Sequence, residues 1–236
     1  MKLFPLKTYQ HLFFDLDHTL WDFEKNAEET ILALYDEFNL ARFGKFTSTD
    51  FYRQYSQINH RMWRLFHEGK ITQQELRTGR FEKTFTKLGL AKAEIPAGLS
   101  EAFTSVCPTK TAVFPYTYEV LGYLQRKYTL HIITNGFKEV QQVKMTASNL
   151  HPYFTEVITS ECANCVKPDK KIFDHALHRA QVNAQDCLMI GDSLEADMLG
   201  ARNAGIDQVF FNPAKKCHHA QVTYEISCLS ELMQVL

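Results

Sequence analysis

Two aspartates end the apolar run HLFFDLD near the start of the chain, Asp15 and Asp17, with one leucine between them. Desolvation and mutual repulsion both penalise two carboxylates at the end of a buried strand. A carboxylate can attack a phosphorus centre and form an aspartyl-phosphate, so Asp15 is our candidate nucleophile. A second carboxyl that holds a proton can protonate a leaving group and later deprotonate water. Taken alone, however, the pair fits a solvated strand end or a helix cap better.

The elements that must position this pair follow from the pattern of apolar residues. After Pro115 the chain alternates between helical patterns and short apolar runs: helix 116–127, TLHIITNG, a helix to about 149, EVITS, helix 169–180, CLMIGD, helix 195–204 and QVFF. Strands alternating with helices predict an α/β fold with a doubly wound, Rossmann-like parallel sheet. Ligand sites in such sheets lie at the carboxyl ends of the strands, so the polar residues there are the candidates.

The segment between these strands has a different character. Residues 24–40, 49–67 and 72–89 show helical spacing, and Thr72 followed by Glu75 predicts a capping box. No convincing strand occurs there. We therefore predict an α/β core domain of residues 1–20 plus 109–236, interrupted by an all-helical domain of residues 21–108.

Four strand ends resemble the four motifs of the haloacid dehalogenase superfamily, in matching order and over nearly the whole chain. The motifs are Asp15-Leu-Asp17-His-Thr19, Thr134-Asn135-Gly136, Lys167-Pro168 and Gly191-Asp192-Ser193 running on to Asp197. Together they outweigh the alternatives that hold for each motif alone, such as a surface lysine at position 167. The resemblance also implies that the helical insert is a cap, which closes over the site and reads the leaving group.

The resemblance implies a role for each of these residues. Asp17 is the general acid and base, and Lys167 neutralises the nucleophile and the transferred group. The Thr134 hydroxyl and the Asn135 backbone N–H bind phosphate, and Gly136 leaves room for close approach. Mg²⁺, the hard cation suited to these oxygens, is held by the Asp15 side chain, the Asp17 main-chain carbonyl and the Asp192 side chain. Asp197 is either a further ligand, a support behind the ligands or a helix N-terminal charge.

Asp17 also separates activities within the superfamily, because its dehalogenases lack an acid at this position whereas its phosphatases have one. We therefore predict a phosphomonoester hydrolase. DLDHTLWDF, the insert stretch WRLFHEGKITQQELRTGRF and GDSLEADMLGARNAGIDQVFFNP resemble the pyrimidine 5'-nucleotidase subgroup. The alternatives are a phosphatase for a small metabolite such as a sugar phosphate or phosphoglycolate, a phosphohexose mutase, and a catalytically silent binding protein on the same fold.

A nucleotide substrate needs an aromatic wall for its base and polar groups for its edge and sugar. Trp21 and Phe23 directly follow the catalytic loop and are the candidate base neighbours. Arg80 is a candidate substrate contact, or equally an exposed helix residue. Most of the other aromatic residues of the insert are expected in its core.

Composition bounds the remaining possibilities. Lys and Arg number 26 against 27 Asp and Glu, for a formal charge of -1, which gives no basic field for a nucleic-acid polymer or an anionic membrane. With no signal peptide or membrane span recognised, we expect a soluble cytoplasmic protein that acts on a small phosphomonoester. Cys162 and Cys165 form a CxxC pair; a zinc site would need two more ligands, and Cys217, His218 and His219 offer the only compact cluster. We expect neither a zinc nor a redox role there.

Overall fold

The computed structural model describes residues 7–236. The expectation that the chain starts without a signal peptide concerns residues 1–6 in part, and these lie outside the described residues. The chain divides into two compact units. The first combines the residues up to Asp22 with Thr111–Leu236, and the second is Phe23–Lys110. These boundaries lie two residues beyond the expected ones at 20 and 108.

The first unit, which we call the sheet unit, is built on six parallel strands. They are β1 (His11–Phe14), β2 (Thr129–Thr134), β3 (Glu156–Thr159), β4 (Cys187–Gly191), β5 (Asp207–Phe211) and β6 (Tyr224–Ile226). Their order is β3-β2-β1-β4-β5-β6, and every neighbouring pair is parallel. The predicted doubly wound parallel sheet is therefore confirmed. The sequence pattern indicated the first five strands but not β6.

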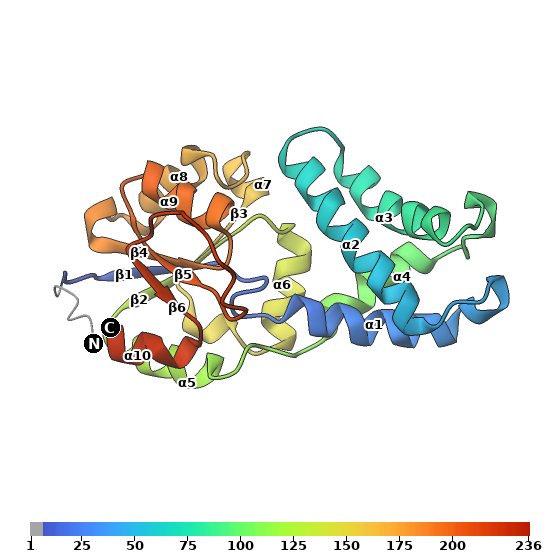
Figure 1. Ribbon diagram of the computed structural model, residues 1–236. Coiled ribbons are helices and arrows are strands. Elements are labelled where there is room, and N and C mark those ends of the chain that lie inside the picture. The colour runs from blue at the N-terminus through green and yellow to red at the C-terminus, as the bar shows by residue number, and fades with distance from the viewer. Residues whose placement is uncertain (1–6) are drawn as a thin grey trace. The chain divides into compact units, whose positions relative to one another are not determined.

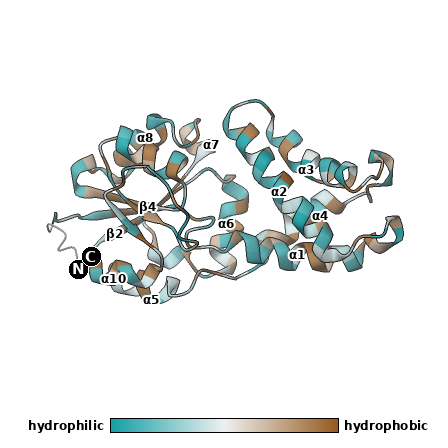
Figure 2. Ribbon diagram, viewed as in Figure 1, coloured by the Kyte–Doolittle hydropathy of each residue, from teal (hydrophilic) through white to brown (hydrophobic). Residues whose placement is uncertain are grey.

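Helices cover both faces of this sheet, with α8 and α9 on one side and α5 and α10 on the other (Figure 1). The helices of the unit are α5 (Thr117–Leu124), α6 (Lys138–Ala147), α7 (Ser160–Ala163), α8 (Lys170–Ala180), α9 (Gly200–Asn203) and α10 (Leu232–Val235). A π-helical turn, Leu194–Leu199, precedes α9 where one helix 195–204 was expected. The buried residues Phe13, Ile133 and Met189 pack with Phe173 of α8 in one core cluster. Hydrophobic residues accordingly line the strands in the middle of the unit (Figure 2).

The second unit, the helical unit, contains no strand among its residues 23–110. Its helices are α1 (Phe23–Glu37), α2 (Ser48–His67), α3 (Gln73–Lys87) and α4 (Leu99–Val106). The predicted capping box at the start of α3 is confirmed, because the Thr72 hydroxyl accepts from the Glu75 N–H and the Glu75 carboxylate accepts from the Thr72 N–H. No helix formed by residues 7–236 has the length and apolar character needed to cross a membrane.

Two histidines in contact, His131 buried and His11 half-buried, lie in β2 and β1, away from the carboxyl ends of these strands. His131 of β2 is 1% exposed and stacks on Phe13 at 4.7 Å between ring centroids. Its Nε2 lies 3.1 Å from Nδ1 of His11, so one ring donates to the other. Burial, and next the neighbouring His11, lower the pKa of His131 to about 4. His131 therefore stays neutral in the folded protein at pH values where an exposed histidine is charged.

We expect this histidine to make folding stability fall in mild acid. Between pH 6.5 and about 4 the unfolded chain binds a proton at position 131 that the folded chain excludes, so stability is present above pH 6.5 and is lost as the pH falls. The full loss is about 3 kcal/mol for a difference of this size. His131→Phe should flatten the pH dependence of the unfolding free energy measured in urea, whereas the same change at exposed His178 should leave the dependence unaltered. Equal slopes in His131→Phe and the wild type would contradict this assignment.

Candidate active site

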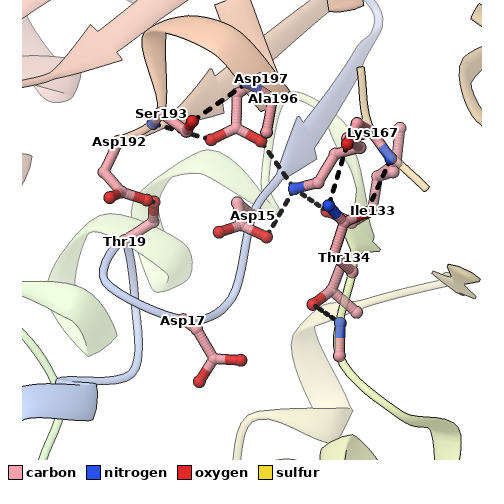
Figure 3. Close-up of polar contacts among 12 residues, drawn as sticks. Asp15, Asp17, Thr19, Ile133, Thr134, Lys167, Asp192, Ser193, Ala196 and Asp197 are labelled. Atoms are coloured by element: carbon pink, nitrogen blue, oxygen red, sulfur yellow. Dashed lines mark hydrogen bonds and ion pairs between the residues drawn. The ribbon is translucent and has the colours of Figure 1, made fainter. Parts of the chain in front are cut away.

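The carboxyl ends of three neighbouring strands bring the predicted residues together (Figure 3). Asp15 directly follows β1, Thr134 is the last residue of β2, and Asp192 directly follows β4. The Asp15 N–H donates to the Ile190 carbonyl of β4 at 2.9 Å, so the loop leaves the sheet only after Asp15. Because β2, β1 and β4 are adjacent in the sheet, residues more than 100 positions apart in the sequence share one edge.

Lys167 lies at the centre of this edge and is 2% exposed. Its Nζ donates to Asp15 Oδ1 at 2.7 Å, to Asp197 Oδ1 at 2.6 Å and to the Ile133 carbonyl at 2.8 Å. These three acceptors use all three protons of the ammonium group. Burial alone would lower the pKa of Lys167, but the Asp15 and Asp197 carboxylates outweigh it and raise the pKa. Lys167 is thus a buried, permanently charged group and not a surface lysine.

The Asn135 side chain fixes the backbone that carries Lys167. Its Nδ2 donates to the Lys167 carbonyl at 3.1 Å, and its Oδ1 accepts from the Lys167 N–H at 2.7 Å. The Ser160 hydroxyl in turn donates to the Asn135 carbonyl at 3.2 Å. The sequence suggested only the Asn135 backbone N–H as a functional group, and the contacts give its side chain this additional role.

Three carboxylates lie close together at this edge, and Lys167 contacts two of them, Asp15 and Asp197. Oxygen atoms of Asp15, Asp192 and Asp197 lie within 4.8 Å of one another. Burial and the negative charge of Asp197 together raise the pKa of Asp192 to about 7. Burial and the neighbouring carboxylates also raise the pKa of Asp15, although the positive charge of Lys167 lowers it. A site of closely spaced carboxylate oxygens with an excess of negative charge fits a hard divalent cation such as Mg²⁺.

Asp197 is engaged differently from the other two acids. Its Oδ1 accepts from Lys167, and its Oδ2 accepts from the Ser193 N–H at 3.0 Å. A Cβ at Gly191 would lie 2.3 Å from that Oδ2, so only glycine leaves room for the carboxylate. Of the roles expected for Asp197, these contacts favour a support that holds Lys167 and the loop after β4.

Asp17 lies in a separate environment, where its carboxylate points away from Asp15 and Asp192 (Figure 3). Its Oδ1 is 2.5 Å from Nζ of Lys144, and its Oδ2 accepts from Nε2 of Gln141 at 2.8 Å. Burial alone would raise the pKa of Asp17, but Lys144 and then Gln141 outweigh it and lower the pKa. The two aspartates of the motif therefore differ in protonation behaviour although they are two residues apart.

Sequence reasoning did not identify Lys144 and Gln141, both of which lie on α6. A signal was present in the sequence, since residues 141, 144, 145 and 148 follow the i, i+3, i+4, i+7 spacing of a buried helix face and two of them are Gln and Lys. Polar side chains on a buried face need partners, which here are supplied by Asp17.

The three candidate substrate contacts, Trp21, Phe23 and Arg80, are all buried or nearly buried. Trp21 is completely buried in the sheet unit, with Nζ of Lys144 4.5 Å from its ring centroid. Arg80 is 6% exposed inside the helical unit, where it donates to Asn59 Oδ1 at 3.3 Å and packs on the Phe103 ring at 4.7 Å. Phe23, the first residue of α1, is 9% exposed. The Trp21 and Arg80 side chains are thus both packed inside their own units, and the alternative of an exposed helix residue at position 80 is wrong. Most of the remaining aromatic residues of the helical unit are buried or half-buried, as expected.

The paired cysteines lie close to the loop of Lys167. Cys162 belongs to α7 and is exposed, and Cys165 is half-buried; neither is in a disulfide. Burial raises the pKa of the Cys165 thiol, which keeps it protonated.

Comparisons with known proteins agree with this geometry. The sequence profile of the haloacid dehalogenase-like hydrolases matches residues 9–205. The pyrimidine 5'-nucleotidase YjjG of Escherichia coli (strain K12) is 32% identical over 232 residues, covering 95% of this chain and 96% of YjjG. The pyrimidine 5'-nucleotidase PynA of Streptococcus pneumoniae is 32% identical over 232 residues, covering 97% of this chain and 95% of PynA. The crystal structure of the HAD-hydrolase YfnB from Bacillus subtilis bound to magnesium is 32% identical with a TM-score of 0.87, covering 97% of this chain and 99% of that one.

Proposed function

We propose that this chain, which belongs to the haloacid dehalogenase-like hydrolase family, is a Mg²⁺-dependent 5'-nucleotidase for pyrimidine nucleoside monophosphates. That it is an enzyme, a phosphatase of this family, follows from its relatives. The observation that carries the proposal is the contrast between Asp15 and Asp17. Asp15 contacts Lys167 and lies close to two other carboxylates. Asp17, in contrast, is held apart from them by Lys144 and Gln141. The contacts thus place Asp15 beside the cation that can neutralise a transferred phosphoryl group, and they fix the Asp17 carboxylate at a separate position.

The proposed reaction has two steps. In the first, a carboxylate oxygen of Asp15 bonds to phosphorus, the bond from phosphorus to the leaving oxygen breaks, and Asp17 gives that oxygen a proton. Because Lys144 and Gln141 lower the pKa of Asp17, this step requires Asp17 to take up that proton when the substrate binds. In the second, Asp17 takes a proton from water, the water oxygen bonds to phosphorus, and the bond between phosphorus and Asp15 breaks. The Lys167 ammonium group and the Thr134 hydroxyl stabilise the charge on the phosphoryl oxygens.

The Asp15 side chain, the Asp192 side chain and the Asp17 main-chain carbonyl would hold Mg²⁺, with Asp197 behind them. When bound, the ion neutralises negative charge on the phosphoryl oxygens. We expect exhaustive chelation to lower phosphate release at least about 100-fold, because several kcal/mol of charge stabilisation are lost. Added Mg²⁺ should restore the rate. Turnover that survives chelation, checked by metal analysis of the same sample, would contradict the Mg²⁺ assignment.

The substrate class rests on relatives that span both units of the chain, YjjG and PynA. In this proposal the helical unit, Phe23–Lys110, acts as the cap that reads the leaving group. Its core aromatics include Phe51, Tyr55 and Phe103, which are buried, so base recognition falls to other side chains of the unit.

A phosphate-release screen tests this function. Wild-type protein should release phosphate from UMP and dTMP faster than from sugar phosphates or phosphoglycolate. A clear preference for sugar phosphates would replace the nucleotidase by a small-metabolite phosphatase. Conversion of a sugar phosphate into its isomer would indicate a mutase, and no turnover of any of these would indicate a binding protein.

A further inference from the structure

The buried face of α6 holds both oxygens of the Asp17 carboxylate. Gln141 is 0% exposed and Lys144 is 5% exposed, and they are spaced three residues apart on one face of the helix. Lys144 Nζ lies 2.5 Å from Asp17 Oδ1, and Gln141 Nε2 lies 2.8 Å from Asp17 Oδ2. The Trp21 ring lies 4.5 Å from the same Nζ, which restricts where the ammonium group can move. The Asp17 carboxylate is therefore fixed by one rigid element.

Gln141 also contacts the proposed phosphate-binding hydroxyl. Its Nε2 lies 2.7 Å from Thr134 Oγ1, so the two N–H bonds of one amide reach Asp17 and Thr134. The Gly136 N–H donates to the same hydroxyl oxygen at 3.1 Å. A hydroxyl has two lone pairs and one proton. With both lone pairs accepting, the Thr134 proton is left to be donated to another group, which in the proposed reaction is a phosphoryl oxygen.

The glycine of this loop makes the arrangement possible. A Cβ at Gly136 would lie 2.2 Å from Gln141 Nε2 and 2.4 Å from its Cδ, far inside any allowed contact. The sequence suggested that Gly136 leaves room for a phosphate. In the structure the space beside its Cα is filled by the Gln141 amide.

We propose that Lys144 and Gln141 are positioning residues for the reaction. Lys144 holds the carboxylate of the acid and base, Asp17, and Gln141 ties that carboxylate to the phosphate donor Thr134. The helix α6 thus sets the distance between the group that binds phosphate and the group that moves the proton. This inference rests on the proposed phosphatase function.

The test compares Lys144→Met and Gln141→Leu with matched changes on the exposed side of the same helix, Lys138→Met and Gln142→Leu. Lys144→Met should lower kcat about 10- to 100-fold, because a displaced proton donor slows catalysis by amounts of this order. It should change the inhibition constant of inorganic phosphate less than about 2-fold, since Nζ of Lys144 contacts the Asp17 carboxylate, which is not one of the proposed phosphate-binding groups. Gln141→Leu should lower kcat and also weaken phosphate inhibition about 10-fold, because it additionally orients Thr134. Both control variants should match the wild type.

A second measurement separates positioning from general damage to the fold. In an Asp17→Asn background, assayed with an aryl phosphate whose leaving group needs little protonation, Lys144→Met should change kcat less than about 2-fold, because residues acting through one group are not additive. If Lys144→Met is unfolded at the assay temperature, Lys144→Gln is used with the same expectation. The inference is overturned if the full decrease persists in the Asp17→Asn background, or if the variants equal their controls in an active enzyme. Wild-type protein that hydrolyses no phosphomonoester would overturn the proposed function itself, and this inference with it.

Discussion

Asp15→Asn is expected to lower kcat for every phosphomonoester by at least about 10⁴-fold, the order of loss seen when a nucleophile is removed. The amide has nearly the same size as the carboxylate and can still accept from Lys167, which lies 2.7 Å from Oδ1. It lacks the negative charge needed to attack phosphorus. Phosphate release and thermal unfolding measured on the same sample check the prediction.

The folded state should tolerate this change. Burial and the carboxylates of Asp197 and Asp192 already disfavour a charge on Asp15, so its replacement by a neutral group should leave the unfolding temperature unchanged or raise it. Asp36→Asn, at an exposed position of the helical unit, is the matched control and should remain fully active. Substantial phosphatase activity in Asp15→Asn would remove Asp15 as the nucleophile.

Lys167→Met is expected to lower both activity and stability. The variant leaves Asp15 and Asp197 buried without the cation that each contacts within 2.7 Å. Breaking such a buried ion pair destabilises by about 3 to 5 kcal/mol, which for a chain of this size lowers the unfolding temperature by about 10 °C. The loss of charge stabilisation at the phosphoryl group should lower kcat about 10³-fold. Lys171→Met, at an exposed position, is the matched control.

A double variant distinguishes the two effects. Lys167→Met combined with Asp197→Asn removes one of the unpaired carboxylates, so it should regain part of the lost stability without regaining activity. If Lys167→Met unfolds within about 2 °C of the wild type, the ion pairs seen at Lys167 do not stabilise the fold as described.

The fold was largely predictable from sequence because the buried strands of a parallel sheet are short and continuously apolar. β4 is of this kind throughout, and β1 and β5 each contain three consecutive apolar residues. β6 escaped notice because it has only three residues and its middle one, Glu225, is exposed. The turn Leu194–Leu199 was expected as part of one helix, since a π-helical turn has no distinct sequence pattern.

The candidate site was predictable where a residue directly follows a strand. Asp15 and Asp192 are placed by the order of the strands alone, and parallel strands end at one edge. The contacts of Asp17 with Gln141 and Lys144 join residues 124 and 127 positions apart and depend on how α6 is rotated, which the spacing of its residues does not specify. Arg80 illustrates the opposite error. A charged residue on a helix suggests an exposed contact, whereas here aromatic rings and Asn59 accommodate it in the core.

The placement of two carboxylates at the end of β1 has a physical explanation. Asp15 faces Lys167 and two further acids that together suit a divalent cation, and Asp17 faces a lysine and an amide of α6. Lys144 and Gln141 outweigh the desolvation of the Asp17 carboxylate, whereas Lys167 offsets that of Asp15 only in part and leaves the remainder to a bound cation. The leucine between the two acids is completely buried, as expected for a residue that anchors the loop to the core.

If phosphate passes through a covalent bond to Asp15, that bond can be trapped. In Asp17→Asn, an aryl phosphate with a good leaving group should form the acyl phosphate quickly and hydrolyse it slowly, because the base of the second step is missing. Rapid acid quenching followed by borohydride reduction converts an aspartyl-phosphate into homoserine, which peptide mass spectrometry locates. We expect a burst of aryl alcohol approaching one per chain and homoserine at position 15. A burst without modification of Asp15, modification of another residue, or neither a burst nor a modified residue would contradict it.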